Sequence, residues 1–257
     1  MIVNGLHYDV EGAGPTLLLV PGGPLDATAF AGLVPLLADT FTVVTYDPRG
    51  LSRSATEDTA QITVAGQAAD ALAVLDAVST EPAYVFGHSG GALTTMALVE
   101  RHQHRVRTAV LMEPPLVGLL PDAADIQAND RLVTEAYERD GVWAAAGVFM
   151  AQAGLEEEGQ EAPPEEWLAA MEANFDVFFG RMYRSIGEYT PDFAALAAAP
   201  TTFEVGVGST TTGELANRAA VAVAERLGRP TVEFPGDHNG FTTDPEASAV
   251  VLRKLLS

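Results

Sequence analysis

A run of small residues between two apolar segments restricts the fold more than any other feature. Apolar residues 83–86 end at Gly87, Ser89 follows, and after Gly91 residues 92–99 have helical character. This order predicts a strand, a sharp turn with Ser89 at positive φ, and a helix, with glycines where larger side chains would collide. Such a turn lifts the Ser89 hydroxyl clear of the sheet edge. It also aims the first N–H groups of the helix at whatever the oxygen attacks.

Length, charge and cysteine content exclude several classes of protein. The chain has 257 residues and is 47% hydrophobic, which predicts one large globular domain or a domain with an insertion. A net charge of −21 argues against nucleic acid and anionic membrane surfaces as partners, because both would be repelled. We expect a small-molecule substrate. The absence of cysteine excludes disulfides and cysteine nucleophiles. The sequence opens without a basic, apolar leader, so we expect no signal peptide or membrane span and a cytoplasmic location. Whether the protein is a monomer or a homodimer stays open.

Short apolar runs alternate with helical segments through most of the chain. A parallel sheet wound by crossover helices has this pattern, and its ligands gather at the carboxyl ends of the strands. The sequence therefore predicts an α/β fold with a mostly parallel, doubly wound sheet. Asn4-Gly5 predicts a hairpin at its edge. The expected strands after the hairpin are 16–20, 41–46, 83–86, 109–112, 202–207 and 231–234, and the expected helices are 29–38, 63–78, 92–99, 214–227 and 245–256.

Residues 116–199 interrupt this alternation. They contain no convincing strand, and we expect them to form a helical lid inserted into a core made of residues 1–115 and 200–257. The lid helices are expected at 130–140, 142–155 and 166–179, with an acidic, proline-containing loop at 156–165. Most of its large apolar residues should form the lid's own core, while some face the pocket. The pocket candidates, with one residue from the core, are Leu25, Trp143, Phe149, Phe175, Phe179 and Met182.

A serine needs a base to accept its proton during attack, and histidine suits that role. His238 lies on a glycine-flanked loop after the last expected strand, which makes it the candidate base. The other four histidines lie in the hairpin, beside the serine or in a polar helix end: His7, His88, His102 and His104. No histidine pair has metal-ligand spacing with a carboxylate, so we expect neither a metal nor another cofactor.

An imidazolium needs a buried carboxylate to orient and stabilise it. Loop 208–213, which follows the penultimate strand, contains no carboxylate. Glu113 ends the strand after the serine's helix and is the favoured candidate acid. Glu214 is the alternative, and Asp237 is disfavoured because neighbours in an extended segment point in opposite directions.

An oxyanion hole requires two N–H donors near the developing charge, each worth about 3 kcal/mol of barrier. The N–H of Gly90, directly after the serine, is one candidate. The turn Pro21-Gly22-Gly23-Pro24 offers Gly23 as the second, with Leu25 as the alternative. In the next loop we expect Asp47 and Arg49 to form a local ion pair, supported by hydrogen bonds to backbone.

Together these segments resemble the α/β-hydrolase superfamily over essentially the full length. The matching motifs are Pro21-Gly22-Gly23-Pro24, Asp47-Pro48-Arg49-Gly50, Gly87-His88-Ser89-Gly90-Gly91 and Gly236-Asp237-His238. The resemblance implies a serine hydrolase that cleaves an ester, lactone or thioester of a small to medium apolar molecule through an acyl-enzyme.

Two departures from the family pattern matter. Pro21 stands where a histidine is frequent, and the frequent acid after the penultimate strand is missing. The second departure resembles the branch with a glutamate after the sixth strand, seen in fungal resorcylic-lactone hydrolases and some haloalkane dehalogenases. Ser89 argues against dehalogenases and epoxide hydrolases, which use an aspartate nucleophile.

The motifs indicate the fold far better than the substrate. Carbon–carbon hydrolysis, cofactor-free perhydrolysis and natural-product tailoring would use the same three side chains. A hydrolase-fold protein that binds a small ligand without turnover is a further alternative.

Overall fold

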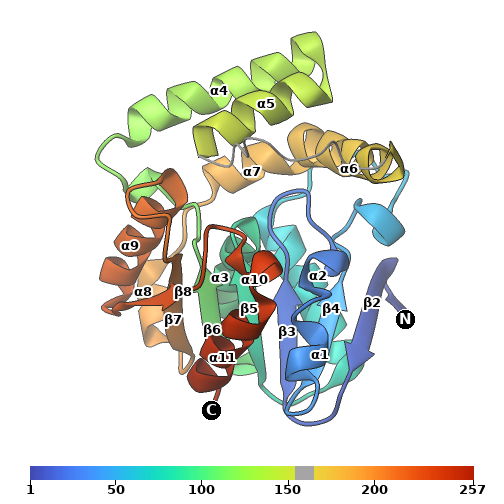
Figure 1. Cartoon of the computed structure of the whole chain (residues 1–257), viewed down its shortest axis with the longest axis vertical. Coiled ribbons are helices and arrows are strands. Elements are labelled where there is room, and N and C mark those ends of the chain that lie inside the picture. Colours follow the sequence, from blue (N-terminus) through green and yellow to red (C-terminus); the bar gives the residue numbers. More distant parts are fainter. Residues whose placement is uncertain (154–164) are drawn as a thin grey trace.

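One mixed sheet organises the molecule. The computed structural model describes residues 1–153 and 165–257 and contains an eight-stranded sheet in the order β1-β2-β4-β3-β5-β6-β7-β8 (Figure 1). The strands are β1 (Ile2–Val3), β2 (Leu6–Glu11), β3 (Thr16–Val20), β4 (Thr42–Tyr46), β5 (Ala83–His88), β6 (Val106–Met112), β7 (Thr202–Gly208) and β8 (Thr231–Phe234). Strands β3 to β8 pair in parallel, whereas β1 and β2 form an antiparallel edge. The predicted α/β class is confirmed.

The edge hairpin forms at the predicted turn. Asn4 (φ 49°) and Gly5 (φ 81°) both occupy the left-handed region, as a two-residue hairpin turn requires. Val3 pairs with Leu6 across the turn. The hairpin therefore joins the sheet through β2 and forms one edge of it, while the parallel strand β8 forms the other edge.

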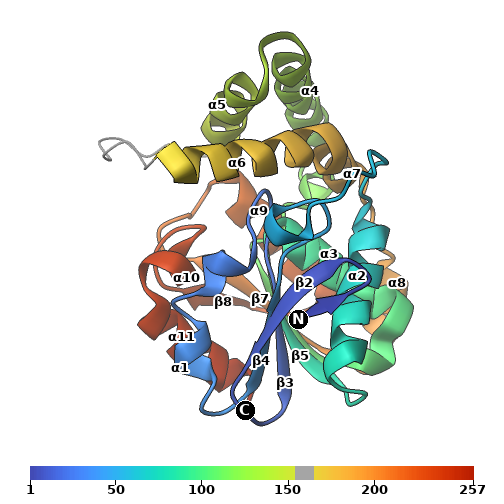
Figure 2. The same cartoon turned by 90° about the vertical axis from the view of Figure 1, so that its right-hand side faces the viewer.

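Both faces of the sheet are covered by helices because the strands are apolar on both sides. On β3, Leu17 and Leu19 contact one layer, while Leu18 and Val20 contact the other. Helices α1 (Val34–Leu37), α10 (Gly240–Thr243) and α11 (Pro245–Leu255) form the first layer (Figure 2). Helices α2 (Val64–Val78), α3 (Gly90–His102), α8 (Phe193–Ala198) and α9 (Leu215–Leu227) form the second. Short 3₁₀ turns lie at η1 (Ala27–Phe30), η2 (Ser52–Ser54), η3 (Gln103–Arg105) and η4 (Val117–Leu119).

The prediction of one continuous helix at 29–38 is wrong. The segment consists of η1, a break, and α1, in which Pro35 occupies the first turn. Proline lacks the N–H that a helix interior needs but is tolerated at a helix start. Pro35 therefore begins a new helix here.

A helical insertion joins β6 to β7 at the carboxyl ends of the strands, above the sheet in Figure 1. It comprises α4 (Ala123–Asp140), α5 (Val142–Ala153), α6 (Glu165–Val177), a π-helical turn η5 (Phe178–Met182) and α7 (Tyr183–Glu188). Its described residues contain no strand. Of the acidic loop expected at 156–165, residues 156–164 lie outside the described residues. Across residues 1–153 and 165–257, no helix combines the length and apolar character needed to span a bilayer.

Candidate active site

Ser89 lies at the sharp bend between β5 and α3. Its φ is 53°, so the predicted positive φ is confirmed. Its N–H donates to the Met112 carbonyl at 2.8 Å, which extends the β5–β6 pairing to the bend. A Cβ at Gly87 would lie 2.4 Å from Thr95 Oγ1, and one at Gly91 would lie 2.3 Å from the Val20 carbonyl oxygen. The two glycines therefore permit the close packing of strand, bend and helix.

The two predicted oxyanion donors are brought together beside Ser89. A Cβ at Gly22 would lie 2.6 Å from Ser89 Cβ, so the glycine turn packs directly on the serine. A Cβ at Gly90 would lie 3.6 Å from the Gly23 nitrogen. The alternative donor is disfavoured, because the N–H of Leu25 donates to the Gly22 carbonyl at 3.0 Å. Gly23 and Gly90 thus line the same cavity as Ser89.

Glu113 and His238 form a buried pair although 125 positions separate them. Glu113 follows β6 directly, and its N–H donates to the Gly206 carbonyl of β7 at 3.0 Å. His238 lies on the loop after β8, and its Nδ1 is 2.6 Å from Glu113 Oε2. Glu113 is fully buried and His238 is 6% exposed. A carboxylate on Nδ1 keeps the proton there and leaves Nε2 to accept one.

Loop 208–211, which contains no carboxylate, binds the Glu113 side chain instead. The N–H of Gly208 donates to Glu113 Oε1 at 2.9 Å, and the Thr211 hydroxyl lies 2.5 Å from the same oxygen. Burial opposes ionisation of Glu113, but the hydrogen bonds from His238, Thr211 and Gly208 hold the pKa of its carboxyl below the ordinary value. Glu113 is therefore an ionised carboxylate in a dry site at neutral pH.

Glu113 also has an unusual backbone. Its φ of 44° is in the left-handed region, which costs a residue with a Cβ roughly 1–2 kcal/mol. The two prolines that follow prevent the strand from continuing, as the sequence indicates. The strain is offset by the four contacts that the residue makes through its N–H and its carboxylate.

The two alternative acids, Asp237 and Glu214, do not bind the candidate base. Asp237 Oδ1 accepts the N–H of Asn239 at 2.8 Å within its own loop. Glu214 precedes α9, and burial together with the charge of Glu113 raises its pKa. Neither side chain forms a hydrogen bond with His238 in the part of the chain that the structure describes. Geometry therefore favours Glu113.

His88 contacts the candidate base, His238. The sequence alone indicates no role for His88 in the site. His88 is 2% exposed, and its Nε2 donates to the His238 carbonyl at 3.0 Å. Its ring also packs between His238 and Phe241, at centroid distances of 4.5 and 4.7 Å. Burial lowers the pKa of His88 well below its ordinary value, so it is a neutral donor. It points away from the cavity, and its one described hydrogen bond steadies the backbone of His238.

A cavity of about 110 Å³ lies at this edge of the sheet. Ser89, Gly90, Gly23 and His238 line it from the core, and side chains of the insertion line it from the other side. No direct hydrogen bond joins Ser89 to His238 among the described residues, an arrangement common in enzymes without substrate. Residues 1–153 and 165–257 contain no group of three His, Asp or Glu side chains placed to hold a metal ion.

The predicted pocket lining is mostly wrong. Phe149 lines the cavity, but the other five candidates do not belong to its described lining. Phe175, Phe179 and Met182 pack into the insertion's own apolar core instead. Trp143 is 44% exposed. Leu25, whose N–H closes the glycine turn, is half-buried in that loop. Residues that sequence reasoning did not select line the cavity in their place: Asp130, Phe178, Tyr183, Ile186 and Leu215.

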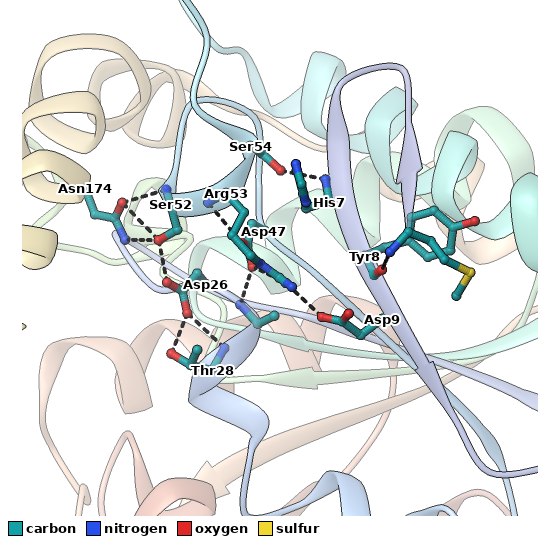
Figure 3. Close-up of polar contacts among 12 residues, drawn as sticks. His7, Tyr8, Asp9, Asp26, Thr28, Asp47, Ser52, Arg53, Ser54 and Asn174 are labelled. Atoms are coloured by element: carbon teal, nitrogen blue, oxygen red, sulfur yellow. Dashed lines mark hydrogen bonds and ion pairs between the residues drawn. The ribbon is translucent and has the colours of Figure 1, made fainter.

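The ion pair expected in the loop after β4 is also wrong. Asp47 pairs with Arg53, with Nε to Oδ2 at 2.7 Å, whereas Arg49 pairs with Asp70. Asp47 does bind backbone as expected, accepting the N–H of Arg53 at 3.0 Å and that of Ala27 at 3.2 Å. The second contact braces the segment that follows the glycine turn (Figure 3).

Asn174 of α6 fastens the insertion to the same segment. It is 3% exposed, and its Nδ2 donates to the Pro24 carbonyl at 3.1 Å. Its Oδ1 accepts the N–H of Ser52 at 2.9 Å, and the Ser52 hydroxyl donates to Asp26 Oδ2 at 2.5 Å (Figure 3). A single asparagine within a predicted helix carries no sequence signal for such a role. The structure therefore adds a polar link between insertion and glycine turn that sequence reasoning missed.

Comparison with known proteins shows the family of this chain. The α/β hydrolase fold family matches residues 15–139. An uncharacterised hydrolase of Bacillus subtilis, YraK, is 33% identical over 245 residues, which cover 92% of this chain and 87% of that protein. The chain belongs to the α/β hydrolase superfamily. The sequence-based recognition is confirmed.

Two further proteins resemble this hydrolase over most of its length. Zearalenone hydrolase of Bionectria ochroleuca is 29% identical over 254 residues, covering 96% of this chain and 92% of that one. The solved structure of a thermophilic esterase from Thermogutta terrifontis superposes with a TM-score of 0.75 at 20% identity and covers 98% of this chain and 92% of that chain. At that identity, the second likeness concerns the fold alone.

Proposed function

We propose that this α/β hydrolase cleaves an ester, lactone or thioester of a small to medium apolar molecule through an acyl-enzyme on Ser89. The observation that carries the proposal is the convergence of three separate segments of the core on one cavity. Ser89 and Gly90 come from the bend after β5, Gly23 from the turn after β3, and His238 from the loop after β8. Glu113 supports His238 from the end of β6.

In the acylation step, Ser89 Oγ attacks the substrate carbonyl carbon while His238 Nε2 takes the hydroxyl proton. The carbonyl oxygen becomes an oxyanion that the N–H groups of Gly23 and Gly90 stabilise. Glu113, bound to Nδ1, stabilises the imidazolium. Collapse of the tetrahedral intermediate breaks the bond to the leaving group, which receives the proton from His238.

Deacylation repeats the sequence with water. His238 removes a proton from the water as its oxygen attacks the acyl carbon, and the second tetrahedral intermediate uses the same two donors. The carboxylic acid product forms when the bond to Ser89 Oγ breaks and His238 returns the proton to the serine. For a lactone, the alcohol and the acid are parts of one opened product.

The character of the cavity supports an apolar substrate. Its lining is mainly aliphatic and aromatic, including Val117, Phe149 and Ile186. We propose that the helical insertion acts as a lid over this cavity, because α4, α5 and η5 contribute part of the lining. The relative named zearalenone hydrolase makes zearalenone a first trial substrate.

A fluorophosphonate probe tests the proposal directly, because it labels only serines that a base activates. Wild-type protein should be labelled in a single position and lose hydrolysis of p-nitrophenyl esters in step with labelling. Ser89→Ala should be neither labelled nor active. Ser79→Ala, which alters a serine at the end of α2, is the matched control and should behave as wild type. Equal labelling of wild type and Ser89→Ala would contradict the proposal.

A further inference from the structure

One carboxylate lies in the wall of the otherwise apolar cavity. Asp130 belongs to α4 and reaches the cavity from the insertion, whereas Ser89 and His238 reach it from the sheet edge. It takes no part in the proposed chemistry. The substrate would lie between this carboxylate and the serine, because both line the same space.

Tyr183 fixes the orientation of Asp130. The Tyr183 hydroxyl donates to Asp130 Oδ1 at 2.8 Å. The tyrosine ring is held in turn by Phe149 and Phe178, at centroid distances of 5.8 and 5.6 Å. Its two neighbours also line the cavity, as does Tyr183 itself. The carboxylate is therefore attached to an aromatic wall that cannot turn freely.

The second oxygen of Asp130 lies beside bare backbone. A Cβ at Gly187 would be 4.0 Å from Oδ2, and Gly187 lines the same cavity. Since the glycine has no side chain, nothing from this position covers Oδ2. One carboxylate oxygen is thus used by Tyr183, and the other forms no hydrogen bond among the described residues. Asp130 and Gly187 line the active-site cavity and also a neighbouring, more open hollow.

The position of Asp130 is unfavourable for the stability of the fold. A carboxylate against apolar walls loses hydration, and burial raises its pKa above the ordinary value. Arginine or lysine normally compensates such a charge, yet no ion pair involves Asp130 in the described residues. In ligand cavities, a few placed polar groups among apolar side chains fix the orientation of the ligand.

We infer that Asp130, oriented by Tyr183, accepts a hydrogen bond from a donor group on the substrate at a distance from the scissile carbonyl. The inference rests on the proposed function and narrows its substrate class. The preferred substrates are esters or lactones whose apolar skeleton carries a hydroxyl or an ammonium group remote from the bond that is cleaved.

A matched series of p-nitrophenyl esters tests the inference. The acyl chains increase in length and end in a methyl, a hydroxyl or an ammonium group, and kcat/KM is measured for each. At one chain length, wild type should prefer a donor-ended ester over its methyl-ended equivalent by about tenfold to a hundredfold, the usual worth of a hydrogen bond to a charged group. A preference for hydroxyl and ammonium together indicates a general acceptor, and one for ammonium alone indicates a charge pair.

Three variants separate recognition from a structural role. Asp130→Ala should abolish the preference for donor-ended esters, so that the ratio of their kcat/KM to that of the methyl-ended ester falls to about one. Tyr183→Phe should lower this ratio while keeping the aromatic ring. Asp130→Asn should lower the preference for ammonium more than that for hydroxyl, because the amide keeps an acceptor but loses the charge. Asp125→Asn, an exposed change on the same helix, is the control and should keep the wild-type ratio.

The possible failures are distinguishable. If methyl-ended esters are hydrolysed but the ratios do not differ between wild type and Asp130→Ala, the inference is overturned and the proposed function stands. An equal loss on all esters in Asp130→Ala would also overturn it, because that pattern indicates a purely structural link between α4 and α7. If no ester is hydrolysed and the fluorophosphonate does not react, both proposals are overturned.

Discussion

The sheet edge and the helical insertion hold their polar side chains in different ways. At the edge, Ser89 and Glu113 directly follow the adjacent strands β5 and β6, and their own N–H groups continue the pairing of the sheet. In the insertion, Asn174 and Asp130 extend from helices that are placed by the apolar core around Phe178. Backbone hydrogen bonds thus set the proposed chemistry, while side-chain packing sets what meets the substrate. The backbone hydrogen bonds of the sheet edge are hard to change without losing the fold, whereas the side chains of the insertion can vary.

The largest expected effect comes from the acid at the sheet edge. Glu113→Gln should lower kcat by about 10⁴-fold, because an amide cannot stabilise the imidazolium and favours the wrong tautomer of His238. The measurement is steady-state hydrolysis of a p-nitrophenyl ester. Glu214→Gln is the control and should retain nearly all activity. The reverse ranking would move the role of acid to Glu214 and remove the proposed dependence on β6.

A side chain added at the edge should be poorly tolerated. Gly91→Ala would place a Cβ 2.3 Å from the Val20 carbonyl oxygen, and backbone on both sides leaves little room to adjust. We expect a loss of about 3 kcal/mol or more in the free energy of unfolding, measured by urea denaturation. A loss of under about 1 kcal/mol would show that the edge is more adaptable than its hydrogen bonds indicate.

The link between the two regions should have an intermediate effect. Asn174→Ala leaves the buried Pro24 carbonyl without its hydrogen-bond donor, which costs about 1–3 kcal/mol, and also removes the acceptor of the part-buried Ser52 N–H. We expect faster hydrogen exchange in α6 and in residues 22–25, and about a tenfold lower kcat. Asn129→Ala, an exposed change in α4, should alter neither. Unchanged exchange in residues 22–25 would mean that the insertion does not steady the glycine turn.

The smallest effect should have the opposite sign. Gly147 lies exposed within α5, and a Cβ there would meet nothing within 4 Å. Gly147→Ala should raise the free energy of unfolding by about 0.5–1 kcal/mol, because alanine loses less backbone entropy in a helix. Thermal unfolding of this variant beside Gly91→Ala compares one substitution in the two regions. A destabilised Gly147→Ala would contradict the view that the insertion is the more permissive region.

The difference between the regions also explains what the sequence predicts. The bend at Ser89 follows from local sterics, because glycines at fixed spacing are needed wherever strand and helix pack so closely. The positions of the strands in the chain follow from short apolar runs, which are typical of strands covered on both faces. For the acid, the sequence favours Glu113 but does not exclude Glu214, since both precede His238 in the chain. Only the fold shows that Gly208 and Thr211 bind Glu113.

The cavity lining escaped prediction for a geometric reason. The π-helical turn Phe178–Met182 takes more residues per turn than an α-helix, so it shifts the faces of the residues that follow. Phe178 at the start of the turn and Tyr183 directly after it both line the cavity, whereas Phe179 between them does not belong to the lining and packs into the insertion's core. The loop that brings Arg53 to Asp47 also contains Ser52 at a positive φ of 45°, which residue type alone does not indicate.

The position of His238 after the last strand has a consequence for biosynthesis. While the ribosome is still adding β8, the nascent polypeptide already contains its serine bend and its carboxylate, but the proposed proton acceptor has not yet been delivered. The His88 side chain, which donates a hydrogen bond to the His238 carbonyl in the complete fold, is already part of the nascent chain at that stage. Hydrolytic activity would thus arise only after the sheet and the loop that carries His238 have been synthesised.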